Sequence, residues 1–116
     1  MLTLDSTQVL DLHQLREMTC DDSDLMREIV DTLIEDTSNQ LALIDAAIRG
    51  RDVEGCKRLA HYCKGACANA GANAAAEVLK RMERDADEAA FDKCSASLAA
   101  LGSELDRLRI EAGALQ

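Results

Sequence analysis

The residues best suited to chemistry gather around one histidine, in the stretch from Leu59 to Gly71. His61 is one of two histidines in the chain, and Lys64 and Gly65 follow it by three and four positions. On a helix, residues with this spacing are neighbours. An imidazole that titrates near neutral pH can act as a nucleophile, and an adjacent ammonium group suits an anion. The pattern indicates a phosphoryl group carried covalently on a ring nitrogen of His61.

Small apolar residues in the same stretch predict which way His61 faces. Within about 80° of Cys56 on a helical projection lies one stripe, made of Cys56, Leu59, Ala60, Cys63, Ala66, Cys67 and Ala70. His61 falls about 140° from Cys56. We therefore expect the stripe to pack into a bundle and the histidine to face water. The residues expected beside His61 are Lys57, Arg58, Lys64, Gly65 and Ala68.

The small residues beside His61 suggest that another molecule comes close. A glycine inside a helix, such as Gly65, costs about 1 kcal/mol relative to alanine. Close approach of a partner is one reason for a chain to accept this cost at an exposed position. Spacing alone leaves another interpretation open, in which His61 is an ordinary surface histidine on an alanine-rich helix.

A longer pattern surrounds these residues, and it resembles the histidine-containing phosphotransfer (HPt) domain family. The matching positions are Ala60-His61, Lys64-Gly65, Asn69, Gly71-Ala72, Leu79 and Met82-Glu83. The resemblance is specific across residues 52–84 and extends by helix pattern over nearly the whole chain. Departures occur at Cys63, where the family usually has leucine, and at Ala66-Cys67, where it usually has two small hydroxyl residues.

The resemblance implies a role for each matched residue. His61 would carry the phosphoryl group, Lys64 would stabilise the phosphate, and Gly65 would let a receiver domain dock closely. The implied function is to relay phosphoryl groups between receiver aspartates in a two-component phosphorelay. The implied partners are response-regulator receiver domains, a hybrid sensor histidine kinase, or both. We expect no cofactor on this chain, because the resemblance places any Mg²⁺ on the receiver. Docking is expected around Lys57, Arg58, Gly65 and Ala68.

Composition bounds the fold and the kind of partner. The 116 residues, with no proline, one tyrosine, one phenylalanine and no tryptophan, predict one helical domain spanning 1–116 and give almost no strand signal. The net charge of −9 disfavours nucleic-acid binding. Apolar runs are too short for a membrane span, and residues 1–30 lack the features of a secretory signal, so we expect a cytoplasmic protein. The starting methionine favours a stand-alone protein over one module of a longer hybrid kinase.

The helix signals predict five helices, over residues 6–18, 23–49, 52–70, 73–85 and 87–112. Possible capping boxes are Asp5 with Gln8 and Asp85 with Glu88, while Gly50 and Asp52 indicate one helix end and the next start. Residues 36–39 are poor in helix interiors and predict a kink or break. Four long helices with short connections predict an all-α, antiparallel four-helix bundle with an additional short N-terminal helix.

The remaining histidine and the cysteines are assigned structural roles. His13 has no small residues beside it and no lysine or glycine at the matching offsets, so we expect an ordinary, partly exposed histidine. Cys56, Cys63 and Cys67 share the apolar face and are expected to be reduced core residues. A zinc site using them would leave His61 pointing away, so we expect no metal site.

A free-standing enzyme is not favoured. The sequence has no Gly-rich phosphate loop, no Glu-x-x-His pair for a di-iron site and no evident carboxylate–histidine pairing. We expect a stoichiometric phosphotransfer intermediate without an ATP site, and a monomer. The alternative is a phosphate-independent helical protein-binding module with an HPt-like fold, which would tolerate His61→Gln.

Overall fold

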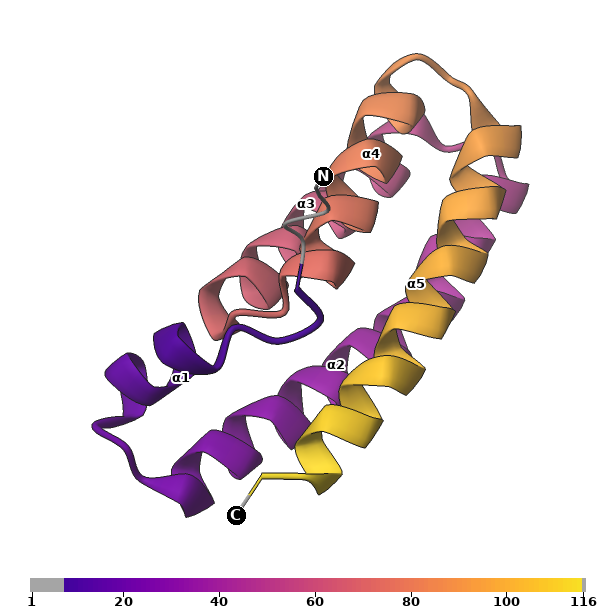
Figure 1. The fold of residues 1–116 in the computed structure, drawn as a ribbon. Helices are drawn as coiled ribbons and strands as arrows, with labels where there is room; N and C mark the ends of the chain where they lie inside the picture. Colours follow the sequence, from indigo (N-terminus) through magenta and orange to yellow (C-terminus); the bar gives the residue numbers. More distant parts are fainter. Residues whose placement is uncertain (1–7, 116) are drawn as a thin grey trace, which may run out of the picture.

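Four long helices form a closed bundle, and a short N-terminal helix lies across one end of it. The computed structural model describes residues 8–115, which contain helices and no strands. The helices are α1 (Leu12–Thr19), α2 (Ser23–Arg49), α3 (Val53–Ala70), α4 (Asn73–Asp87) and α5 (Phe91–Gly113). Figure 1 shows α3 beside α4 and α2 beside α5, and contacts of α2 with α3 and of α4 with α5 close the bundle. The predicted all-α bundle with an N-terminal helix is confirmed.

Aspartate side chains fix the starts of the first three helices. Asp11, Asp22 and Asp52 each accept a hydrogen bond from the backbone N–H three residues later. Such a bond satisfies one of the free donors at a helix start. The boundary between α2 and α3 at Gly50 and Asp52 is therefore where the sequence predicts it.

The first helix starts later than the sequence predicts. Residues 8–11 are not helical, and Asp5 of the expected capping box lies outside the described residues. The backbone of this segment bonds instead to the α3–α4 turn, because Ala74 N–H donates to Gln8 O at 2.8 Å and Asp11 N–H donates to Gly71 O at 2.8 Å. Gln14 of α1 also donates to the carbonyls of Ala68 and Asn69, so α1 is attached to the end of α3.

The second helix runs unbroken through residues 36–39, so the predicted break is wrong. Polar side chains weaken a helix when they bond to their own backbone, and here the side chains of Asp36 and Ser38 bond to other helices instead. Asp36 accepts a hydrogen bond from the Tyr62 hydroxyl, Ser38 accepts one from Arg109, and Thr37 is buried in the bundle.

The predicted start of the last helix, at residue 87, is also wrong. Asp85 and Asp87 belong to α4, and α5 begins at Phe91, so Asp85 and Glu88 do not form a capping box. The chain turns at Ala89, which has a φ of 55°. The Phe91 side chain is buried and anchors the helix start, with the Arg51 guanidinium 5.5 Å above its ring.

The core consists of aliphatic side chains with cysteine and alanine on α3. The largest fully buried apolar side chains are Leu15, Val30, Ile44, Cys56, Cys63, Cys67, Leu79, Met82, Leu101, Leu105 and Leu108. The small residues of α3 let α4 pack closely on it. None of the helices in residues 8–115 has the length and apolar character that crossing a membrane requires.

Gly71 is the position at which this fold demands glycine, and it yields a stability prediction. Its φ is +85°, and an added Cβ would lie 3.0 Å from the Asp11 carbonyl oxygen. We expect Gly71→Ala to lower the free energy of unfolding by about 1–3 kcal/mol, because an L side chain is strained at positive φ and crowds the bonded segment. Urea denaturation followed by far-UV circular dichroism measures this.

Gly102→Ala is the matched control, since an added Cβ at this helical glycine meets no heavy atom within 4 Å. Alanine has the higher helix propensity, so the control should gain up to about 1 kcal/mol. Equal stability of the two variants would contradict the role assigned to Gly71.

Candidate functional site

His61 lies on the outer face of α3, where the sequence predicts it. Its side chain is 70% exposed. Cys56, Ala60, Cys63 and Cys67 occupy the opposite face of the helix and are buried. Because the buried face fixes the rotation of α3, the imidazole must project into solvent.

A carboxylate from α4 holds the imidazole. Glu83 Oε2 lies 3.1 Å from His61 Nδ1, and Glu83 Oε1 accepts a hydrogen bond from Lys64 Nζ at 2.8 Å. The expectation of no carboxylate–histidine pairing is therefore wrong. His61 precedes Gly71 by ten residues and Glu83 follows it by twelve, so the antiparallel α3–α4 hairpin places them opposite each other. Symmetry about the predicted turn at Gly71 was the signal that could have identified Glu83.

Glu83 is ionised near neutral pH, and this determines which ring nitrogen of a neutral His61 carries the proton. The hydrogen bond from Lys64 is the main cause that lowers the Glu83 pKa, and the charges of Lys64 and His61 lower it further against partial burial. An ionised carboxylate accepts hydrogen bonds and cannot donate them. In the neutral imidazole the proton is therefore assigned to Nδ1, which leaves the Nε2 lone pair free.

The second predicted cation, Lys57, is engaged one turn earlier on the same helix. Its Nζ lies 2.9 Å from Asp87 Oδ1, and this hydrogen bond is the main cause that raises the Lys57 pKa. Lys57, Lys64 and Glu83 line a shallow depression of about 360 Å³ between α3 and α4. Lys80 and Arg84 of α4 also line it, and the sequence analysis did not include them.

The other predicted docking residues lie on the exposed surface of α3. Gly65 and Ala68 are exposed, and an added Cβ at Gly65 would meet no heavy atom within 4 Å. Arg58 is exposed on the other side, where it lines a separate depression with Leu43 and Ala46 of α2. The structure thus places Lys64 and Glu83 beside His61. Gly65 has free space around it, and Arg58 lies next to α2, away from the imidazole.

His13 and the cysteines are placed as the sequence predicts. His13 is 84% exposed, and its nearest ion-pair partner is Glu17 of the same short helix, at 3.7 Å. Four cysteines are buried, and burial raises the pKa of Cys63 to about 12 and that of Cys67 and Cys94 to about 11. Across residues 8–115, no group of three or more His, Cys, Asp or Glu is arranged to hold a metal ion.

The chain is similar to a known protein family and to a solved structure. The family model of the Hpt domain matches residues 28–111, a range that contains His61, Lys64 and Glu83 but not α1. Among solved structures, the chain is similar to the crystal structure of histidine-containing phosphotransfer protein B (HptB) from Pseudomonas aeruginosa PAO1. That similarity has 25% sequence identity and a TM-score of 0.83, and covers 93% of this chain and 94% of the other. No curated protein matches the chain.

The ionised Glu83 yields a prediction about pH. A carboxyl whose folded pKa is lowered stabilises the fold above its unfolded pKa, near 4.5, and loses this contribution as the pH falls through the folded value. At pH 7 we expect Glu83→Gln to lower the free energy of unfolding by about 1 kcal/mol, because the charge-assisted hydrogen bond from Lys64 is weakened. That difference should shrink steadily below pH 4.5. Urea denaturation of both proteins between pH 7 and pH 3 measures it.

Glu111→Gln provides the baseline, since Glu111 is exposed and makes no ion pair within residues 8–115. A Glu83→Gln difference that stays constant down to the lowest pH would contradict the pairing of Glu83 with Lys64 and His61.

Proposed function

The chain belongs to the Hpt domain family, and from this premise we propose that it relays phosphoryl groups between receiver-domain aspartates through a phosphohistidine at His61. The observation that carries the proposal is an exposed imidazole whose Nδ1 faces an ionised carboxylate while a lysine lies one turn away. The similarity to HptB, a histidine-containing phosphotransfer protein, supports histidine phosphotransfer as the activity.

The geometry suits attack by Nε2. With Nδ1–H donated to Glu83, the Nε2 lone pair attacks phosphorus of a phosphorylated aspartate in line with the bond that breaks. A nitrogen–phosphorus bond forms, and the electron pair of the phosphorus–oxygen bond leaves on the aspartate carboxylate. The imidazole ring becomes positively charged as the new bond forms. The negative charge of Glu83, 3.1 Å from Nδ1, stabilises that ring.

Lys64 supplies the positive charge that the phosphoryl group needs. Its Nζ is held by Glu83, so the ammonium group is positioned beside His61 before any partner arrives. Preorganised cations stabilise the spread negative charge of a transferring phosphoryl group. Lys57 is the weaker second candidate, because its Nζ is held by Asp87 and not by the Glu83 carboxylate that contacts the imidazole.

The surface around His61 is open to a large partner. Gly65 and Ala68 present little side chain, and we assign docking to this face together with Lys57 and Arg58. We assign any Mg²⁺ in the reaction to the receiver, as the family resemblance implies. The chain then acts as a stoichiometric carrier that a second receiver discharges, and a hybrid sensor kinase can supply the first receiver.

Transfer of label from a phosphorylated receiver domain tests the carrier residue. We expect acid-labile, base-stable label on the parent protein and no label on His61→Gln, since glutamine has no nucleophilic ring nitrogen. His13→Gln is the control and should be labelled like the parent. Label that survives His61→Gln would overturn the assignment of His61. A folded parent that no receiver labels would favour the phosphate-independent binding module.

The open surface at Gly65 yields a second test of the proposal. We expect Gly65→Arg to fold normally, because its side chain meets no neighbour, yet to slow transfer at least tenfold by blocking close approach. Gly102→Arg on α5 is the matched control, since that glycine is also helical, has no heavy atom within 4 Å of an added Cβ, and gains the same charge. Initial rates of label transfer measure both variants. Equal rates for the two would contradict docking over Gly65.

A further inference from the structure

The shallow depression between α3 and α4 is lined by charged side chains alone. Four of the six are cations and two are carboxylates, namely Lys57, Lys64, Lys80, Glu83, Arg84 and Asp87. Two ion pairs cross the depression, since Asp87 holds Lys57 and Glu83 holds Lys64. The other two cations, on α4, form no ion pair within residues 8–115. The depression therefore contains more cations than its carboxylates can pair with.

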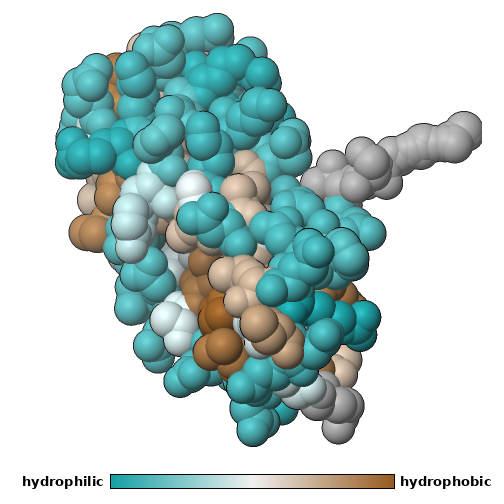
Figure 2. All heavy atoms as spheres, turned by 90° about the vertical axis from the view of Figure 1, so that its left-hand side faces the viewer, coloured by the Kyte–Doolittle hydropathy of each residue, from teal (hydrophilic) through white to brown (hydrophobic). Residues whose placement is uncertain are grey.

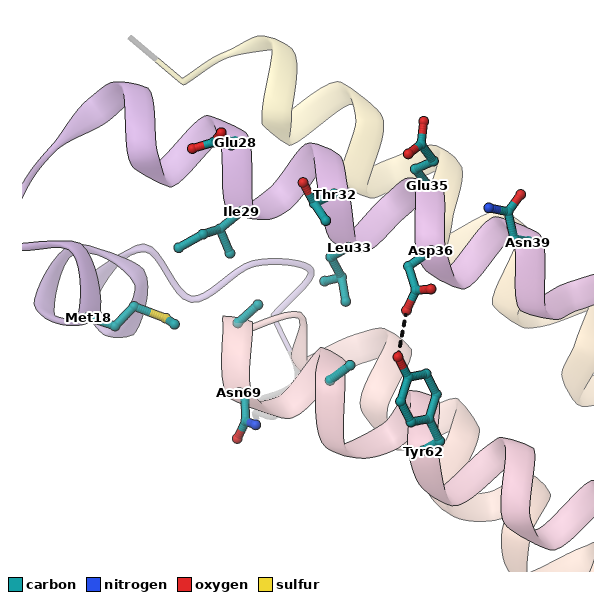
Figure 3. Close-up of a pocket in the computed structure, with 12 residues that line it drawn as sticks. Met18, Glu28, Ile29, Thr32, Leu33, Glu35, Asp36, Asn39, Tyr62 and Asn69 are labelled. Atoms are coloured by element: carbon teal, nitrogen blue, oxygen red, sulfur yellow. Dashed lines mark hydrogen bonds between the residues drawn. The ribbon is translucent and has the colours of Figure 1, made fainter.

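The opposite side of α3, toward α2, is different in character. A groove there is lined by apolar residues such as Met18 and Leu33 (Figure 3), and apolar side chains gather on the face of the molecule seen from the side of α1 (Figure 2). The charged residues in its lining are Glu28, Glu35 and Asp36, with no lysine or arginine. A further cation for an anion on the imidazole would therefore have to come from the α3–α4 side.

The distribution of charge along the chain agrees with this difference. Residues 8–52 contain eleven Asp and Glu but only four Lys and Arg, whereas residues 53–88 contain six of each. The cations of this acidic chain are thus concentrated in the two helices that form the depression.

Lys57 lies on the same side of His61 as Lys64 does. Viewed down α3, Lys57 is about 40° and Lys64 about 60° from His61 in the same direction. Residues three or four apart on a helix are neighbours, so a lysine flanks the imidazole one turn away on each side. Asp87 is the main cause of the raised Lys57 pKa, and the charge of Glu83 contributes to it. Lys57 therefore already experiences the carboxylate that contacts the imidazole.

The ion pair of Lys57 with Asp87 is one that can be exchanged. The Lys57 side chain is 33% exposed and that of Asp87 is 65% exposed, and ion pairs in contact with water are weak. A phosphoryl group carries between one and two negative charges. At a comparable distance it attracts an ammonium group more strongly than a single carboxylate does.

Arg84 is placed to compensate Asp87 if Lys57 leaves. It precedes Asp87 by three residues on α4, a spacing that makes the two side chains neighbours. Both line the depression, and Arg84 is exposed. Its planar guanidinium matches the geometry of a carboxylate. The departure of the lysine would therefore not leave the Asp87 carboxylate without a counter-ion.

We propose that a phosphoryl group on His61 draws Lys57 away from Asp87 and binds it. Arg84 then takes the place of Lys57 on Asp87. This ion-pair exchange rests on the phosphohistidine proposed above. It adds a second phosphate-binding lysine to the site, with Asp87 and Arg84 as positioning residues. Lys64 is in place before transfer, whereas Lys57 joins after transfer and stabilises the stored phosphoryl group.

The test loads His61 chemically, so that it depends on no receiver. The donor is phosphoramidate: Nε2 of His61 attacks phosphorus, the phosphorus–nitrogen bond of the donor breaks, and ammonia leaves. His13→Gln serves as the parent, because it leaves one histidine in the chain. Phosphorus NMR over a range of pH measures the last acid dissociation constant of the phosphoryl group. A cation bound to that group raises the constant.

The exchange predicts opposite effects for the two members of the ion pair. We expect Lys57→Ala to lower the dissociation constant about threefold and Asp87→Asn to raise it about twofold, since one removes the cation and the other its competitor. Lys57→Arg should restore the parent value. Lys57→Ala/Asp87→Asn should match Lys57→Ala. If the pair only joined α3 to α4, both single variants would change the constant in the same direction, and that result would overturn the proposal.

Arg81→Ala and Glu88→Gln are the matched controls. They remove the same charges at exposed positions that do not line the depression. Each should change the constant less than its counterpart in the depression. Changes as large as those at Lys57 and Asp87 would overturn the exchange, because net charge alone would then explain them. Circular dichroism checks that every variant folds.

The role of Arg84 has a test of its own. Arg84→Ala should lower the dissociation constant about twofold, because Asp87 without a substitute cation retains Lys57. The same substitution in the Asp87→Asn background should have no effect. An effect of equal size in both backgrounds would overturn the placement of Arg84 on Asp87.

The outcomes separate the exchange from the relay function. Loaded variants that all match the parent, with His61 labelled normally by a receiver, would overturn the exchange and leave the relay function intact. Failure of every receiver to label His61 would overturn the relay function, even where the chemically loaded variants differ as expected. A folded parent that phosphoramidate cannot load would overturn both, because Nε2 would then not act as a nucleophile.

Discussion

Burial of the small-residue face of α3 is the constraint on which the candidate site depends. Cys56, Ala60, Cys63 and Cys67 have almost no exposed surface, and together they fix the rotation of α3 about its own axis. That rotation decides that His61 points outward. The same small side chains allow α4 to lie close to α3, which brings the Glu83 carboxylate within 3.1 Å of the imidazole. The orientation of the His61 imidazole and the position of its charged partner therefore follow from one packing requirement.

The turn at Gly71 sets the register between α3 and α4. Two pairs show the register, His61 with Glu83 and Lys57 with Asp87. Residues 8–11 bond to the same turn and so add a third segment that depends on its geometry. Because Glu83 binds both His61 and Lys64, a slip of α4 along α3 by one turn would move the carboxylate away from the imidazole and from the cation at the same time.

The sequence was informative where the determining interactions are local. The boundaries of α2 and α3 could be predicted because aspartate caps and Gly50 act within three or four residues. The starts of α1 and α5 could not be predicted. The start of α1 depends on the hydrogen bonds that Gln8 O accepts from Ala74 and that Asp11 N–H donates to Gly71, both far away in the chain, and the start of α5 depends on the burial of Phe91. At the site, the outward direction of His61 followed from helix periodicity alone. Glu83 was missed as a partner because it lies 22 residues away and only the hairpin brings it near.

The two sides of α3 present different electrostatic environments, and this difference has a consequence for phosphoryl transfer. A phosphoryl group on His61 adds between one and two negative charges to a chain that already carries −9. The acidic segment 8–52 would repel the charges of a phosphoryl group placed next to it. The helices α3 and α4, in contrast, carry six Lys and Arg and five Asp and Glu. Lys64 lies within one turn of His61, while charges beyond about 8–10 Å are largely screened at physiological salt. The cation that matters most for the proposed phosphoryl group is thus the local one, Lys64.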